Sequence, residues 1–179
     1  MRRSLVVGWI AAIGGLAAAG CGATTPVAQG SANSTQTARR QLEGKWTMLT
    51  MVVNSEQGKR ATPQAAGDLS LDEFGNITVE YRISDAGRAA LEAIGVKSPN
   101  PVISAQGRVA VDPQRKVVTY MPPDANARAL SADLAALRAN PLAIEHTRYY
   151  VIGSDGILTL TTRHPNGKEA TRSTWKRAS

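Results

Sequence analysis

The sequence is poor in the residue types on which disulfide frameworks and metal sites are built. Its 179 residues include one cysteine, two histidines and a single phenylalanine. One cysteine excludes an internal disulfide, and two histidines exclude a zinc-finger-type cluster. A hydrophobic fraction of 42% is ordinary for a globular chain, and the length suits one domain.

Basic clusters are also missing, although positive charge predominates. Lys and Arg number 21 against 14 Asp and Glu, which gives a net charge of +7, but the basic residues are scattered and not interleaved with aromatics. The pattern therefore does not predict a nucleic-acid-binding surface. We expect the positive charge either to favour contact with anionic lipid surfaces or to have no specific role.

Residues 1–20 read as a secretory signal peptide. Arg2 and Arg3 precede a short apolar run that ends in small residues, as such signals do. A membrane-spanning helix needs about 20 predominantly apolar residues, and this run is shorter and rich in glycine and alanine.

The segment Leu16-Ala17-Ala18-Ala19-Gly20-Cys21 resembles the lipobox of bacterial lipoproteins, with Ala18 where leucine is most usual. The resemblance implies that the Cys21 thiol is diacylglycerated and that the chain is cut before it. Several acyl chains make a stable membrane anchor, because each buried methylene contributes about 0.8 kcal/mol. Gly22 in place of aspartate agrees with sorting to an outer membrane, facing the periplasm, if the source is diderm. The alternative is an ordinary signal with an incidental cysteine.

Residues 21–40 are small and polar without apolar periodicity, so they predict a flexible, lipidated tether in front of one domain at 41–179. Within that domain, hydrophobic residues recur at every second position. Asn76 to Ser84 is the clearest case, with Ile77, Val79, Tyr81 and Ile83 on one face. The predicted strands are 45–53, 68–74, 76–84, 102–111, 115–121, 146–152, 157–163 and 170–177.

Short turn signals connect these strands. Asp112-Pro113, Asp155-Gly156 and Asn166-Gly167 predict tight reversals between antiparallel neighbours. Residues 85–95 and 126–139 instead have helical spacing, and we expect both helices to pack against a barrel end or, alternatively, to form a lid. Eight strands in an up-and-down order can close and remove both sheet edges. The predicted fold class is all-β with two short helices, an eight-stranded antiparallel barrel.

Gly44-Lys45-Trp46, Arg148 to Gly153 and the terminal Trp175-Lys176-Arg177 resemble the bacterial lipocalin-like domain. The resemblance extends over about residues 42–177 and implies a calycin-type barrel. It also implies that Trp46 covers the closed end, with Arg177 packed across its ring as a barrel-closing pair. Such a cation–π pair contributes roughly 0.5–2 kcal/mol.

Four residues are candidate ligand contacts: Tyr81, Tyr120, Arg148 and Tyr150. Arg148 and Tyr150 share one face of a strand, and an interior arginine needs an anionic or carbonyl partner. That partner is a ligand carboxylate, Glu145, Glu80 or a backbone carbonyl. The tyrosine hydroxyls either contact a ligand head group or stay wet while their rings fill the core.

No pattern predicts catalysis, a metal site or a cofactor. His146 and His164 flank strands, lack further ligands at suitable spacing, and are expected to face solvent. Neither a nucleophile elbow nor a phosphate-binding glycine loop occurs. The leading hypothesis is a lipid-anchored envelope protein, not an enzyme, whose barrel carries or scavenges a small hydrophobic or amphipathic ligand. The alternative is a protein-interaction module with a filled barrel and an unknown protein partner.

Overall fold

A computed structural model describes residues 27–97, 100–121 and 147–179. The helix predicted at 126–139 and the candidate residues Cys21, Glu145 and His146 lie outside this part of the chain. The helices are α1 (Val27–Leu42) and α2 (Asp85–Ala93). The strands are β1 (Gly44–Asn54), β2 (Arg60–Ala61), β3 (Ala65–Leu71), β4 (Asn76–Ile83), β5 (Val102–Asp112), β6 (Val117–Met121), β7 (Thr147–Ile152), β8 (Leu158–Arg163) and β9 (Glu169–Arg177).

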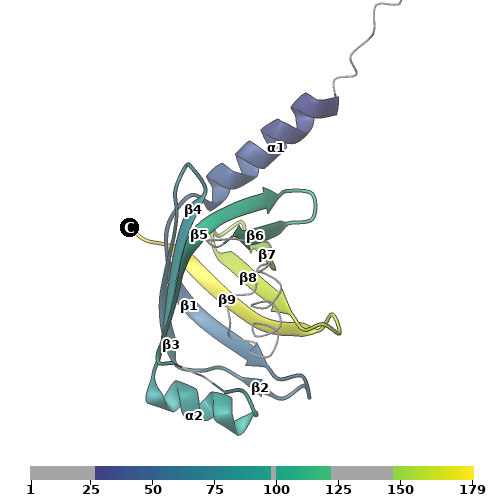
Figure 1. The fold of residues 1–179 in the computed structure, drawn as a ribbon. Helices are drawn as coiled ribbons and strands as arrows, with labels where there is room; N and C mark the ends of the chain where they lie inside the picture. The colour runs from purple at the N-terminus through teal and green to yellow at the C-terminus, as the bar shows by residue number, and fades with distance from the viewer. Residues whose placement is uncertain (1–26, 98–99, 122–146) are drawn as a thin grey trace, which may run out of the picture.

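The sheet closes on itself. Strands pair antiparallel in the order β1-β3-β4-β5-β6-β7-β8-β9, and β9 returns to β1, while the two-residue β2 pairs only with β1 (Figure 1). The predicted closed eight-stranded up-and-down barrel is confirmed, and it is consistent with a calycin-like fold. Gly156 and Gly167 have positive φ, 76° and 82°, which the predicted hairpin turns require.

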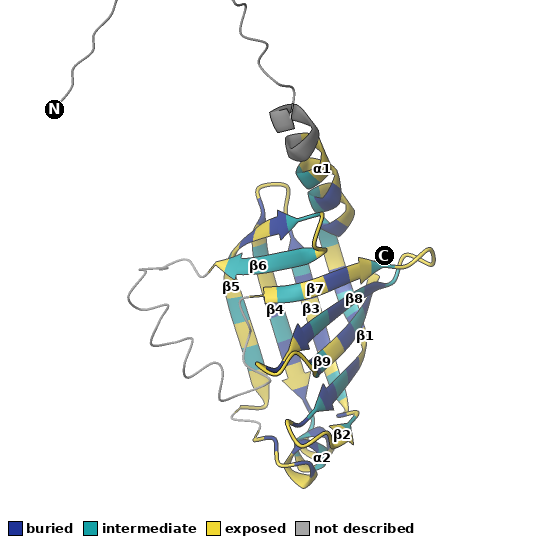
Figure 2. Cartoon of the chain, turned by 90° about the vertical axis from the view of Figure 1, so that its right-hand side faces the viewer, coloured by how far each residue is buried: buried dark blue, intermediate teal, exposed yellow. Residues whose placement is uncertain are grey.

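Alternation along the strands builds the core. In β4, Val79, Tyr81 and Ile83 are buried, whereas Thr78 and Arg82 are exposed. Figure 2 shows the same change between buried and exposed residues along the other strands. Because successive side chains point to opposite faces, each strand of the barrel directs one alternate set of side chains to the interior.

The barrel wall is lower between β5 and β8. The pairing of β6 with β7 extends over three residue pairs, from Val117–Tyr149 to Thr119–Thr147. Strand β5 continues from Arg108, the partner of Met121, back to Val102, toward the end that carries α2 (Figure 1). Within the described residues, this part of β5 pairs with β4 and has no strand paired on its other side.

Helix α1 corrects the prediction of a flexible tether over residues 21–40. From Val27 onward the chain is helical, and Ala38 and Leu42 of the last turns are buried against the barrel. The Trp46 Nε1 donates to the Leu42 carbonyl oxygen at 2.9 Å. Residues 21–40 have no apolar period that predicts this helix, and the contacts of Ala38 and Leu42 with the barrel core stabilise it.

The predicted pair of Trp46 and Arg177 closes the end of the barrel that carries α1. The two residues are register partners on β1 and β9, and the guanidinium carbon lies 4.5 Å from the centroid of the indole. Arg177 also donates to the Glu43 and Gln41 carbonyl oxygens, at 2.6 and 2.8 Å. Gly44 makes room, since a Cβ there would lie 2.7 Å from Arg177 Nη1.

Helix α2 packs at the opposite end. Its N-cap is Ser84, whose side chain accepts from the Gly87 amide, one residue earlier than the Asp85 expected from the sequence. Leu91 is fully buried and belongs to the same core cluster as Ile83. Packing against the barrel end is therefore the observed role of this helix.

We predict that Arg177→Ala lowers the free energy of unfolding by about 2 kcal/mol, because the ring contact and two charge-assisted hydrogen bonds are lost together. Urea denaturation measures the change. Arg172→Ala on the same strand is the control; its exposed ion pair with Glu169 contributes less than about 1 kcal/mol. Equal losses in the two variants would contradict the closing role of Arg177.

Candidate functional site

Two narrow cavities lie inside the barrel. The inner cavity, toward α1, has an apolar wall that includes Leu42, Leu69, Ile77, Val109, Val118 and Leu158. The outer cavity, toward α2, is lined by residues that include Met51, Ile83, Ile103, Thr162 and Ser173. The volume available to water is about 40 Å³ in the inner cavity and about 20 Å³ in the outer cavity. One water needs about 10–15 Å³ by that measure, so side chains fill most of the interior.

Arg148 lies between the two cavities and lines both. Its Nη1 donates to the Tyr81 hydroxyl at 2.7 Å, and its guanidinium carbon is 5.9 Å from the centroid of the Tyr81 ring. Of the internal partners considered from the sequence, Glu80 forms an ion pair with Arg82 instead. In the part of the chain that the structure describes, no carboxylate pairs with Arg148.

Tyr81 is held rigidly on the inner face of β4. Its ring meets the Trp175 ring edge-on, with centroids 5.7 Å apart and an interplanar angle of 62°. Trp175 fits because Gly67 lacks a side chain; a Cβ there would lie 3.2 Å from the indole and 2.7 Å from the Met48 Cε. The Tyr81 hydroxyl, and with it the end of Arg148, is therefore placed by packing.

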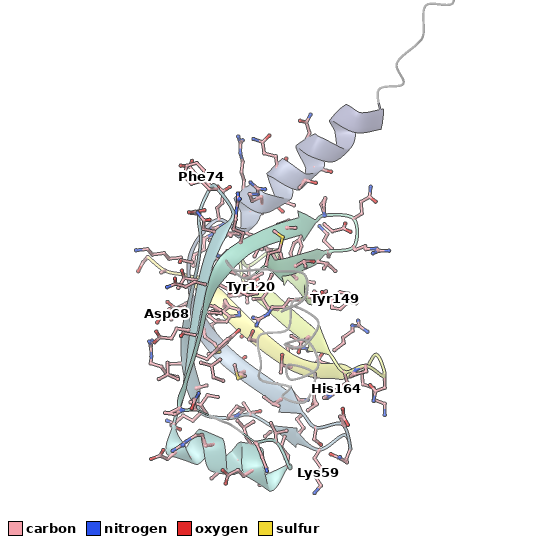
Figure 3. All side chains as sticks on the ribbon, in the orientation of Figure 1. Lys59, Asp68, Phe74, Tyr120, Tyr149 and His164 are labelled. Carbon is pink, nitrogen blue, oxygen red and sulfur yellow. The ribbon has the colours of Figure 1, made fainter. Side chains whose placement is uncertain are left out.

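Tyr120 lines the inner cavity, but its hydroxyl points to the backbone. The hydroxyl donates to the Gln106 carbonyl oxygen, and the ring covers Gly107, where a Cβ would lie 3.0 Å from ring carbons (Figure 3). Burial raises the pKa of Tyr120 above its usual value, and the positive charge of Arg148 opposes this rise. Tyr120 thus contributes its ring, rather than a free hydroxyl, to the cavity.

Tyr150 lies outside the lining of both cavities. Its side chain is buried, and its hydroxyl has no hydrogen-bond partner among the residues that the structure describes. The Lys116 Nζ lies 5.7 Å from the ring centroid. Burial, and then the negative charge of Asp112, raise the pKa of Tyr150. Of the four candidate ligand residues, the structure brings Tyr81, Tyr120 and Arg148 to the cavities.

Several polar residues of the interior were not anticipated. The Thr162 and Thr171 hydroxyls lie 2.7 Å apart, and Ser173 accepts from the Trp175 Nε1 at 2.9 Å. His164 is buried, with Nε2 2.9 Å from the Asn54 carbonyl oxygen, so the prediction that it faces solvent is wrong. Alternation along β8 places residues 158, 160 and 162 inside, and extending it by one step would have placed His164 inside as well.

Within residues 27–97, 100–121 and 147–179, no cluster of three His, Cys, Asp or Glu residues is arranged to hold a metal ion. Neither of the described helices is long and apolar enough to cross a membrane. Comparison with protein-family models and with curated proteins finds no match for this chain. The cavities themselves are thus the features from which a function can be argued.

Tyr150→Phe is expected to leave the free energy of unfolding unchanged or raise it by up to about 1 kcal/mol, because it removes a buried hydroxyl that lacks a partner. Tyr81→Phe is the matched variant and should lower it by about 1–2 kcal/mol, since it removes the acceptor of Arg148. Urea denaturation of both variants tests the pair. A larger loss for Tyr150→Phe would mean that its hydroxyl is satisfied.

Proposed function

We propose that this chain is a lipid-anchored envelope protein whose lipocalin-like barrel binds a small hydrophobic or amphipathic molecule. The observation that carries the proposal is the inner cavity, whose wall is almost wholly apolar and whose floor is sealed by α1 and the pair of Trp46 and Arg177. Binding would be driven by burial of apolar ligand surface, at about 25 cal/mol per Å². Polar groups near Arg148 would fix the orientation of the ligand.

The width of the cavities restricts the ligand. About 40 Å³ at the inner cavity suits an unbranched chain better than a ring system. Ile103, Met51 and Leu160 border the outer cavity and have flexible or apolar side chains, so a chain can enter with small rotamer changes. The proposed ligand is therefore slender, with one apolar tail.

The anchor gives the barrel an orientation in this proposal. Cys21 precedes Val27, the first residue of α1, by six positions. Helix α1 leaves the closed end, opposite the end that carries α2 (Figure 1). A lipid on Cys21 would hold the closed end toward the bilayer, so the ligand would enter from the side that faces away from the membrane.

Cys21→Ser is expected to abolish both incorporation of a labelled palmitate and recovery of the protein in salt-washed membranes. Salt screens surface charge, so membrane binding that survives the wash reports the acyl anchor rather than basic residues. The control, Cys21→Ser with Ser34→Cys, keeps one cysteine but moves it out of the lipobox-like segment. Palmitate incorporation into the double variant would contradict the anchor at Cys21.

Calorimetric titration of the full chain carrying Cys21→Ser with octanol tests the barrel. We expect saturable binding that Val118→Phe weakens roughly tenfold or more, because the new ring occupies the inner cavity; one factor of ten corresponds to about 1.4 kcal/mol. Val151→Phe makes the same change on the outer face of β7, where Val151 is 60% exposed, and should have no effect. Absence of binding to the parent chain would refute the carrier function.

A second candidate rests on the outer face of β7. Val151 and Tyr149 are exposed there, and the Arg163 guanidinium carbon lies 4.7 Å from the centroid of the Tyr149 ring. Aromatic and arginine side chains are enriched at the centres of protein interfaces. If the barrel proves unable to bind octanol, contact with another envelope protein through this face becomes the better explanation.

A further inference from the structure

Resting on the proposed function, we propose that the ligand is a singly charged carboxylate with one unbranched apolar tail. Its head group binds the guanidinium of Arg148, and its tail lies in the inner cavity between Arg148 and α1. This assigns to Arg148 the role of selecting anionic over neutral ligands.

Among the described residues, no negative charge pairs with Arg148. Arg148 is half-buried, and its guanidinium stays protonated at all physiological pH values. Partial removal of a charge from water is costly unless an anion or several acceptors compensate. The partner of Arg148 in the structure is the neutral hydroxyl of Tyr81, and the guanidinium offers five N–H donors in total. Among the residues that line the two cavities, Arg148 is the one charged side chain.

Arginines outside the barrel differ in this respect. Arg82, Arg88 and Arg172 each pair with a carboxylate on the protein surface. The acidic residues of β3 and β4, Asp68 and Glu80, both bind Arg82. Figure 3 shows Asp68 on the outer face of the sheet. Strand alternation therefore places Asp68 and Glu80 outside and Arg148 inside, and none of the described carboxylates pairs with Arg148.

The surroundings of Arg148 define the size and charge of the anion. One guanidinium neutralises one negative charge, and its planar fork matches the two oxygens of a carboxylate. On one side of Arg148 the wall is apolar, with Val118, Leu158 and Leu69. On the other side, the outer cavity of about 20 Å³ has room for one water next to Thr162 and Ser173, and such a water would hydrate the head group. The lining changes from polar to apolar at Arg148. A carboxylate head group at Arg148 would therefore contact the polar outer cavity, and its tail would lie in the apolar inner cavity.

The test compares octanoate, octanol and octylamine, which share one tail and differ in charge, by calorimetry at neutral pH with the full chain carrying Cys21→Ser. We expect octanoate to bind at least roughly tenfold more tightly than octanol, because a charge-assisted hydrogen bond is gained, and octylamine to bind most weakly. Arg148→Met should remove the preference for octanoate while octanol still binds. Arg163→Met makes the same change in net charge on the outer surface and should preserve the preference.

Two results would overturn the proposal while leaving the proposed function intact: equal affinities of the parent chain for octanoate and octanol, or an undiminished preference in Arg148→Met. Absence of binding by all three compounds would instead refute the proposed function itself.

A second measurement, by NMR, needs no variant. The carboxyl carbon-13 signal of bound octanoate should titrate with a pKa below that of the free acid, because a neighbouring cation favours the charged form. An unshifted or raised pKa would also overturn the proposal.

Discussion

The contact of Arg177 with Trp46 is the interaction on which the rest of the molecule depends. It joins the last strand to the first, and the same two side chains donate hydrogen bonds to the carbonyl oxygens of Gln41, Leu42 and Glu43. Carbonyls at a helix C-terminus lack partners within the helix, and these donors supply them. One cluster therefore closes the sheet, ends α1, and brings Leu42 into the floor of the inner cavity.

Local patterns predicted the strands because half-buried strands have a period of two and because turns need particular residues. The error at β3 shows the limit of the pattern. The strand was expected at 68–74 but spans Ala65–Leu71, because the Asp72 carboxylate accepts from the Phe74 and Asn76 amides and forms the turn. Helix α1 and the two-residue β2 have no comparable local signal, since contacts with distant residues stabilise them.

The same limit applies to the candidate site, where the sequence predicted the face on which a residue lies but not its partner. Alternation placed Arg148 and Tyr81 on interior faces, yet it could not reveal that two residues 67 positions apart share a hydrogen bond. It also could not distinguish the hydroxyl of Tyr120, which binds its neighbouring strand, from that of Tyr150, which is buried without a partner. A face follows from local sequence, whereas a partner across the barrel follows from strand order and register.

A barrel filled this closely would select the ligands proposed for it by a different physical rule than a wide barrel. In a roomy chamber, affinity follows the apolar area buried, and many shapes of ligand satisfy it. Here the free space is narrow, and a fixed charge stands halfway along it, with Tyr81 and Trp175 holding its position. A neutral chain that enters leaves the guanidinium without a counter-charge, whereas an anion supplies one at the level where the wall turns apolar. Charge at one residue can therefore discriminate between ligands of equal length, which apolar packing alone cannot do.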